Sequence, residues 1–179
     1  MKRIHLFLAV SVGVILASCK NDDDAAPEVI NEEETITTVK LTVTESGTTT
    51  SQEYTWKDGS GEDITLEANK TYNASIEFLD ESNPSDVEDI TEEVIEEKDE
   101  HFVFFQTTAG GVTISSASDD IKDSDQTGIN IKTDWATTDA GKGTIKAILI
   151  LEPTTKTGNS RADFGGETDI EVDFNVTIQ

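Results

Sequence analysis

Alternation of apolar and polar residues is the feature that most constrains the fold of this chain. It is clearest near the C-terminus, where five apolar side chains alternate with polar ones: Ile170, Val172, Phe174, Val176 and Ile178. Successive side chains of a β-strand point to opposite faces of the sheet, so this pattern predicts a strand with one buried and one wet face. The same period recurs within residues 39–43, 54–56, 72–78 and 129–135.

Residues 102–105 and 145–151 form nearly continuous apolar runs, which suit central strands covered on both faces. Residues 112–117 predict a weaker strand. Segments rich in Gly, Asp, Asn, Ser and Thr separate the runs, and the helical crossovers of parallel sheets are missing. We therefore predict an all-β chain, an antiparallel immunoglobulin-like β-sandwich of about eight strands.

Residues 85–100 depart from the two-residue period. Ile90 and Val94 have helical spacing in a strongly acidic segment. Glu92 and Glu96 lie one helical turn apart, and like charges at that spacing destabilise a helix. One short acidic helix or a loop is predicted here.

Residues 66–76 combine a leucine, a turn of small residues and Tyr72 at the start of an alternating strand. This spacing resembles the tyrosine corner of fibronectin type III and immunoglobulin-like domains. The resemblance implies that the Tyr72 hydroxyl closes a hydrogen bond onto the preceding turn. Too few strands precede it for a regular fibronectin topology, so we expect an altered strand order.

The N-terminus predicts a signal peptide. Residues 1–3 are a basic start, residues 4–16 are mostly apolar but too short to span a bilayer, and residues 17–18 are small. Leu-Ala-Ser-Cys closely resembles the lipobox of bacterial lipoproteins, which implies removal of residues 1–18 and lipid attachment to the sulfur of Cys19. The alternatives are an ordinary cysteine at the end of a cleaved signal, or an apolar run that stays as an anchor.

Residues 19–34 predict an acidic, flexible tether between the lipid and a single β-sandwich domain at 35–179. Lys20, Asn21 and three aspartates resemble the signal that exports lipoproteins of the Bacteroidota to the outer face of the outer membrane. The resemblance implies an outer-membrane, lipid-anchored and surface-exposed protein. Its partners would be the membrane, through the lipid, and an unknown protein or glycan.

Charge excludes one class of partner. The chain has 13 Lys and Arg against 37 Asp and Glu, a formal net charge of −24. Nucleic acid and anionic headgroups bind clustered Lys and Arg, so we expect no nucleic-acid partner. The acids serve either as solvated surface or in cation binding. No cysteine follows Cys19, so the domain forms no internal disulfide and depends on its apolar core.

One acidic loop resembles the first half of a calcium-binding loop. Asp123, Asp125 and Thr127 alternate and are followed by Gly128, with Asp119 nearby. Alternate oxygen donors can face one ion, and glycine permits the sharp bend, so Ca²⁺ is the one cofactor that the sequence suggests. The alternative is a solvated turn.

His101 is the only histidine after the signal peptide, and it follows Glu97 and Glu100. An imidazole beside carboxylates could bind a transition metal. The alternative is an ordinary turn or surface histidine, because good transition-metal sites use several nitrogen or sulfur ligands.

Trp56 and Trp135 lie near predicted strand ends, where exposed rings could stack on a sugar. Both also fit alternating apolar patterns, which favours packing in the core. No catalytic motif is recognisable, because the single His101 lacks a serine or cysteine partner in a known pattern, and we expect no enzyme.

Beyond the signal and tether, the chain resembles a group of small Bacteroidota lipoproteins of unknown function. The shared segments are residues 31–39, 89–93, 100–101, 135–137 and 166–179. Members are sometimes labelled as type 1 periplasmic-binding-fold proteins, but that label implies a two-lobed α/β fold, which the strand pattern contradicts.

The sequence as a whole predicts a non-catalytic, lipid-anchored interaction or ligand-binding module, with calcium as a candidate stabiliser. The alternative is a metal-carrier or glycan-binding accessory protein of an uptake system. A glycoside hydrolase is a third candidate, and it would require two facing carboxylates in a cleft.

Overall fold

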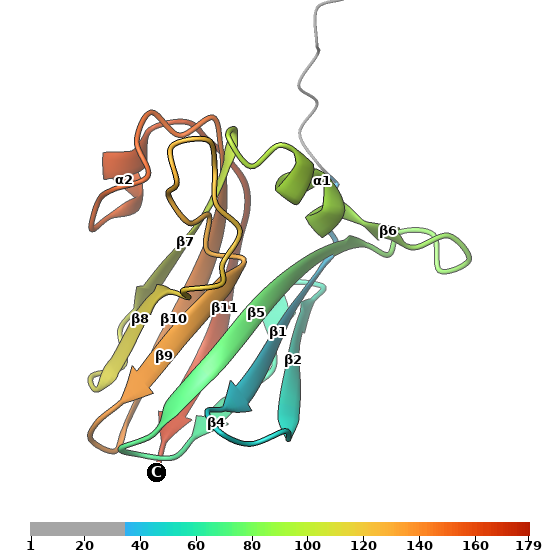
Figure 1. Cartoon of the computed structure of the whole chain (residues 1–179). Coiled ribbons are helices and arrows are strands. Elements are labelled where there is room, and N and C mark those ends of the chain that lie inside the picture. The colour runs from blue at the N-terminus through green and yellow to red at the C-terminus, as the bar shows by residue number, and fades with distance from the viewer. Residues whose placement is uncertain (1–34) are drawn as a thin grey trace, which may run out of the picture. The chain divides into compact units, whose positions relative to one another are not determined.

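The computed structural model describes residues 35–179, which form two packed β-sheets (Figure 1). The larger sheet contains β1 (Thr38–Glu45), β2 (Ser51–Lys57), β3 (Ser60–Gly61), β5 (Thr71–Asp80), β6 (Glu88–Asp89), β8 (Val112–Ser116) and β9 (Lys132–Thr137). Its order is β3-β2-β1-β5-β9-β8, and β6 pairs with β5. The smaller sheet contains β4 (Ile64–Leu66), β7 (His101–Thr107), β10 (Gly141–Leu151) and β11 (Glu167–Ile178), in the order β4-β11-β10-β7. The prediction of an all-β sandwich is confirmed.

One main core lies between the sheets and contains buried side chains from both. In β11 the buried positions are Val172, Phe174, Val176 and Ile178, as the alternation predicts. In the larger sheet the opposing side chains come from every second residue of β1 and β5. The described residues all belong to one compact unit.

The sandwich is not purely antiparallel, which corrects the prediction. β4 runs parallel to β11, with Val176 opposite Ile64, whereas the other strand pairs are antiparallel. The chain leaves the larger sheet after β3 and joins the smaller one at β4, where it lies along β11 in the same direction. A crossing between sheets can produce a parallel pair without a helical crossover.

β7 is an edge strand, although its continuous apolar run predicted a central one. Its outward-facing side chains belong to a second apolar cluster on the far side of the smaller sheet: Phe102, Phe104, Ile148, Ile150 and Phe164. Phe164 comes from the segment that follows β10, and its ring lies 4.6 Å from that of Phe104, centroid to centroid. Both faces of β7 are therefore covered, which explains its composition.

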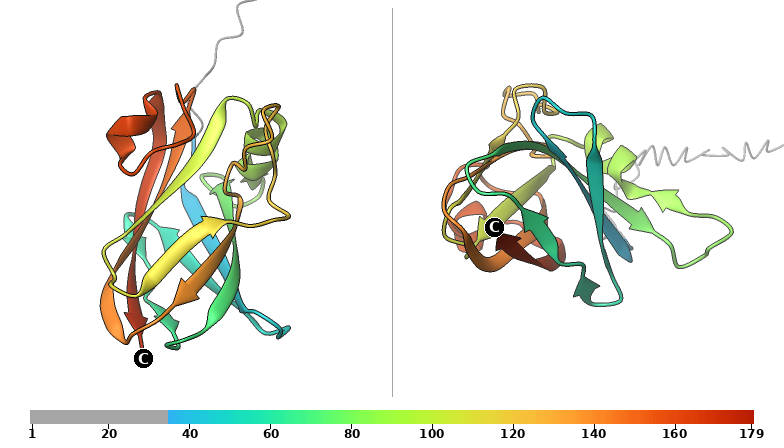
Figure 2. Two further views of the ribbon diagram at one scale, coloured as in Figure 1. Left: turned by 60° about the vertical axis from the view of Figure 1, so that its left-hand side comes forward. Right: turned by 90° about the horizontal axis from the view of Figure 1, so that it is seen from below.

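Two short helices lie at one end of the sandwich, opposite the C-terminus (Figures 1 and 2). The helix α1 (Ile90–Glu96) is the predicted acidic helix, and the Asp89 side chain caps it by accepting from Thr91 N. Buried Ile90 and Val94 offset its charge repulsion. The sequence analysis missed α2 (Arg161–Phe164). Within residues 35–179, no helix is long and apolar enough to cross a membrane.

Candidate functional site

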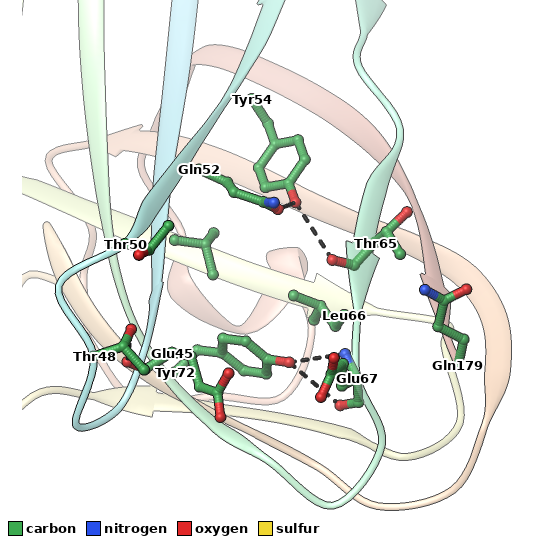
Figure 3. A pocket seen from close by; sticks show the side chains of 11 residues that line it. Glu45, Thr48, Thr50, Gln52, Tyr54, Thr65, Leu66, Glu67, Tyr72 and Gln179 are labelled. Carbon is green, nitrogen blue, oxygen red and sulfur yellow. Dashed lines mark hydrogen bonds between the residues drawn. The ribbon is translucent and has the colours of Figure 1, made fainter.

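A polar cavity of about 380 Å³ lies at the end of the sandwich that carries the C-terminus (Figure 3). Its walls come from the ends of β1 and β11, the β1–β2 loop, and the starts of β2 and β5, and β4 closes one side. Both sheets therefore contribute to it.

The β1–β2 loop places hydroxyl groups at the rim of the cavity. Gly47 adopts a φ of 83°, which glycine tolerates and other residues rarely do. The turn closes when Thr48 N and Thr48 Oγ1 donate to Glu45 O at 3.0 and 2.9 Å. Thr48 and Thr50 then border the cavity.

Tyr72 forms the predicted tyrosine corner. Its hydroxyl accepts a hydrogen bond from Glu67 N at 2.8 Å, which ties β5 to the turn before it. Asn69 has a φ of 58° in that turn, a conformation that asparagine adopts more readily than most residues. The corner is confirmed, and the buried Tyr72 ring forms part of the cavity wall.

Tyr54 links the two sheets across the cavity. Its hydroxyl lies 2.5 Å from Gln52 Oε1 and 3.4 Å from Thr65 O, which belongs to β4 (Figure 3). Burial raises the pKa of the Tyr54 phenol above its usual value. The hydroxyl therefore remains a protonated donor at neutral pH.

The charge of the cavity is acidic but partly balanced. Of the described residues that line it, Glu45 and Glu67 have the only charged side chains. Lys70 lies just outside, with Nζ 2.5 Å from Glu45 Oε1 and 3.6 Å from Glu67 Oε2. The hydrogen bond to Glu45 raises the pKa of Lys70, so the ammonium stays charged.

The predicted calcium loop has a different internal arrangement. Asp123 Oδ1 accepts from the backbone N–H groups of Asp125 and Thr127 at 3.0 and 2.8 Å. Its other oxygen, Oδ2, lies 3.0 Å from Lys156 Nζ, and both side chains are largely buried. A lysine thus lies where a calcium ion would have to bind Asp123.

Asp119 is exposed and pairs with Lys132 at 3.1 Å. The neighbouring Asp120, which the sequence analysis did not select, is buried and accepts from Asn130 N at 2.7 Å. Among residues 35–179, no group of three or more His, Cys, Asp or Glu side chains is placed to hold a metal ion. Calcium binding stays a prediction from the sequence pattern alone.

His101 is buried, not the surface residue of the alternative interpretation. Its side chain is 1% exposed, and Nδ1 lies 3.3 Å from Glu97 O and 3.9 Å from Glu97 Oε2. Nε2 lies 3.9 Å from Oδ2 of Asp169, another side chain only 1% exposed. Glu100 is exposed, and its carbonyl accepts from Glu152 N. The structure therefore places Asp169, and not the predicted Glu100, beside His101.

The tryptophans pack into the core. Trp135 is 1% exposed, its Nε1 donates to Thr133 Oγ1 at 2.8 Å, and its ring meets Phe105 edge-on. Trp56 is half-buried and packs against the main core. Trp135 therefore presents no open ring to a sugar, and the core-packing alternative describes it correctly.

Cys19 lies outside the described residues. Comparison of the chain with models of known families, with curated proteins and with solved structures finds no match. The proposals below therefore rest on the sequence and on the geometry of residues 35–179.

Proposed function

We propose that this protein is a non-catalytic, lipid-anchored binding module of the outer membrane that holds its ligand at the end of the sandwich away from the anchor. One observation supports this proposal most strongly: the start of β1 and the polar cavity lie at opposite ends of the domain. The first strand, β1, begins at Thr38, which pairs with Leu79 close to α1. Glu45, at the other end of β1, lines the cavity.

A lipid at Cys19 would leave this end of the domain free. Residues 19–34 link the predicted acylation site to the first described residue, and an extended chain spans at most about 3.3 to 3.6 Å per residue. The tether would join the domain next to β1, at the helix-bearing end of the sandwich. A cavity at the opposite end would therefore stay clear of the point of attachment.

The placement of His101 supports a role without catalysis. A general base must reach its substrate directly or through one water molecule. The His101 side chain is only 1% exposed and is enclosed by Glu97 and Asp169. The cavity is lined instead by hydroxyl, amide and carboxylate groups without an imidazole.

The anchor is tested by metabolic labelling with palmitate in the native host. Wild-type protein is expected to carry label, whereas Cys19→Ala carries none. Ser18→Ala is the matched control, because alanine keeps a small residue before the cleavage site and should leave labelling intact. Equal labelling of the wild type and Cys19→Ala would refute the lipid anchor.

A further inference from the structure

The cavity offers hydrogen-bonding groups of both kinds around one small volume. Gln52 supplies an amide that can donate and accept, Thr48 and Thr50 supply hydroxyls, and Glu67 supplies a carboxylate. These groups come from the β1–β2 hairpin and from the end of β4, so they surround a ligand from two sides (Figure 3). A ligand with several hydroxyl groups could match this mixture, because each hydroxyl both donates and accepts.

Charge restricts the ligand further. Glu45 and Glu67 repel an anion, and the net charge of −24 on the whole chain adds to that repulsion. Lys70 lies 2.5 Å from Glu45 and 3.6 Å from Glu67, so a cationic ligand would have to compete with an ammonium already in place. A neutral ligand avoids both penalties.

The cavity also has an apolar part. Val43, Leu66 and the rings of Tyr54 and Tyr72 belong to its lining and are all largely buried. Because each of them is less than a tenth exposed, they form the floor of the cavity, and the polar rim supplies most of the surface that a ligand can contact. The volume of about 380 Å³ is at the small end of the range for ligand sites, about 300 to 1,000 Å³.

We infer that the cavity binds a neutral saccharide. This inference rests on the proposed function, because it names the ligand class of the same site. Gln52 and Glu67 bind ligand hydroxyls, and the largely buried Tyr54 and Tyr72 form the floor beneath the sugar. This site differs from the one that the sequence suggested for glycans, at Trp56 and Trp135.

The experiment uses the full mature protein in a zwitterionic, sugar-free detergent. A printed array of glycans that end in neutral hexoses or pentoses is probed together with sialylated and sulfated forms of the same cores. The tightest neutral glycan is then titrated calorimetrically against the wild type and three variants: Gln52→Ala, Glu67→Ala and Gln106→Ala. Gln106 is an exposed residue of β7, outside the cavity lining, and serves as the matched control.

Binding is expected for neutral glycans and not for their anionic forms. Loss of one hydrogen bond to a ligand hydroxyl should weaken binding by about tenfold in Gln52→Ala and in Glu67→Ala. Gln106→Ala should bind like the wild type. The inference fails if no neutral glycan binds, if anionic forms bind better, or if both cavity variants keep wild-type affinity while melting at the wild-type temperature. Palmitate labelling is a separate measurement, so failure of the anchor and failure of the ligand site are distinguishable.

Discussion

Two tyrosine hydroxyls stabilise the cavity end of the sandwich in different ways. Tyr72 accepts from the backbone N–H of Glu67, so its hydroxyl fixes the main chain of the turn before β5. Tyr54 bonds to the side chain of Gln52, an exposed residue whose oxygen water can reach. The two phenols are therefore unequal in their effect on stability.

Replacing Tyr72 with phenylalanine should lower the free energy of unfolding by about 1 to 2 kcal/mol, because the Glu67 N–H loses its acceptor. Tyr54→Phe is the matched control and should cost less, since water can replace its hydroxyl at Gln52. Urea unfolding of both variants measures the difference. Equal losses in the two variants would show that the Tyr72 hydrogen bond contributes no more to stability than that of Tyr54.

Asp123 illustrates how burial and pairing oppose each other at one residue. Burial alone would raise the pKa of its carboxyl, but the hydrogen bond and charge of Lys156 and the N–H groups of Thr127 and Asp125 outweigh it. The pKa of Asp123 is therefore lowered. A lowered pKa in the folded state stabilises the fold above the unfolded pKa of about 3.9, and this contribution is lost as the pH falls through the folded value.

Lys156→Met should lower the free energy of unfolding at pH 7 by about 3 kcal/mol, because it leaves the largely buried Asp123 carboxylate without its cation. The difference between variant and wild type should vanish as the pH falls through the lowered pKa of Asp123 in the wild type, because the carboxyl is then protonated in both proteins. Denaturant unfolding at a series of pH values tests this. A difference that stays constant from neutral to acid pH would mean that the ion pair is not its cause.

The sequence pattern predicted the loop but not the partner of Asp123, Lys156. The spacing of Asp123, Asp125 and Thr127 predicted a turn, and the structure has one, but there Asp123 accepts from the N–H groups of Asp125 and Thr127. Lys156 is distant in the chain and carries no local pattern that connects it to Asp123. Residue pairs of this kind depend on the packing of the segment after β10, which periodicity does not predict.

At the scale of elements, the crossing from β3 to β4 determines the strand order. Gly61 lies against β11, and a Cβ atom there would be 2.4 Å from Asp173 O and 3.1 Å from a ring carbon of Phe174. Only a glycine permits this approach without displacement of β11. The close contact places β4 beside β11 and makes one wall of the cavity.

Gly61→Ala should therefore destabilise the domain by about 2 kcal/mol through a backbone clash. Gly110→Ala is its matched control, because a Cβ at Gly110 meets no atom within 4 Å. Thermal unfolding followed by circular dichroism compares the two variants. An unchanged melting temperature in Gly61→Ala would mean that β3 does not pack on β11 as described.

The second apolar cluster depends on a single ring from outside the sheets. Phe164 is 1% exposed and covers the outer face of β7 and β10. Phe164→Ala should lower the free energy of unfolding by about 3 to 4 kcal/mol, as large-to-small changes in cores do. Val87→Ala changes an exposed side chain, so it should alter the free energy of unfolding by less than about 0.5 kcal/mol. Comparable losses in the two variants would contradict the role of α2 as a cover.

Element type was predictable where the side-chain period is clear, and connectivity was not. β11 and β5 follow directly from alternation, and α1 follows from the spacing of Ile90 and Val94. The edge position of β7 and the parallel β4–β11 pair were missed, because a continuous apolar run reports burial on two faces but not what buries them.

At the scale of the whole molecule, the start of β1 and the polar cavity lie at opposite ends of the domain. The end with α1 receives the chain, and the opposite end presents the cavity (Figures 1 and 2). The sequence predicted the anchor and the sandwich separately. It could not predict the cavity, because its walls come from residues 43–54, residues 65–72 and residue 179, whose hydroxyl and amide groups are ordinary in strands and turns.

The most direct test of this arrangement is to locate the cavity end on living cells. Cys19 is the only cysteine, so a cysteine introduced at exposed Thr49, in the β1–β2 loop, can be labelled alone with a membrane-impermeant maleimide. If Cys19 is lipid-linked and the cavity faces outward, Thr49→Cys should label fully on intact cells while the wild type stays unlabelled even after lysis. Labelling of Thr49→Cys only after lysis, or labelling of the wild type at a free Cys19 thiol, would contradict a lipid-anchored domain with an outward-facing ligand site.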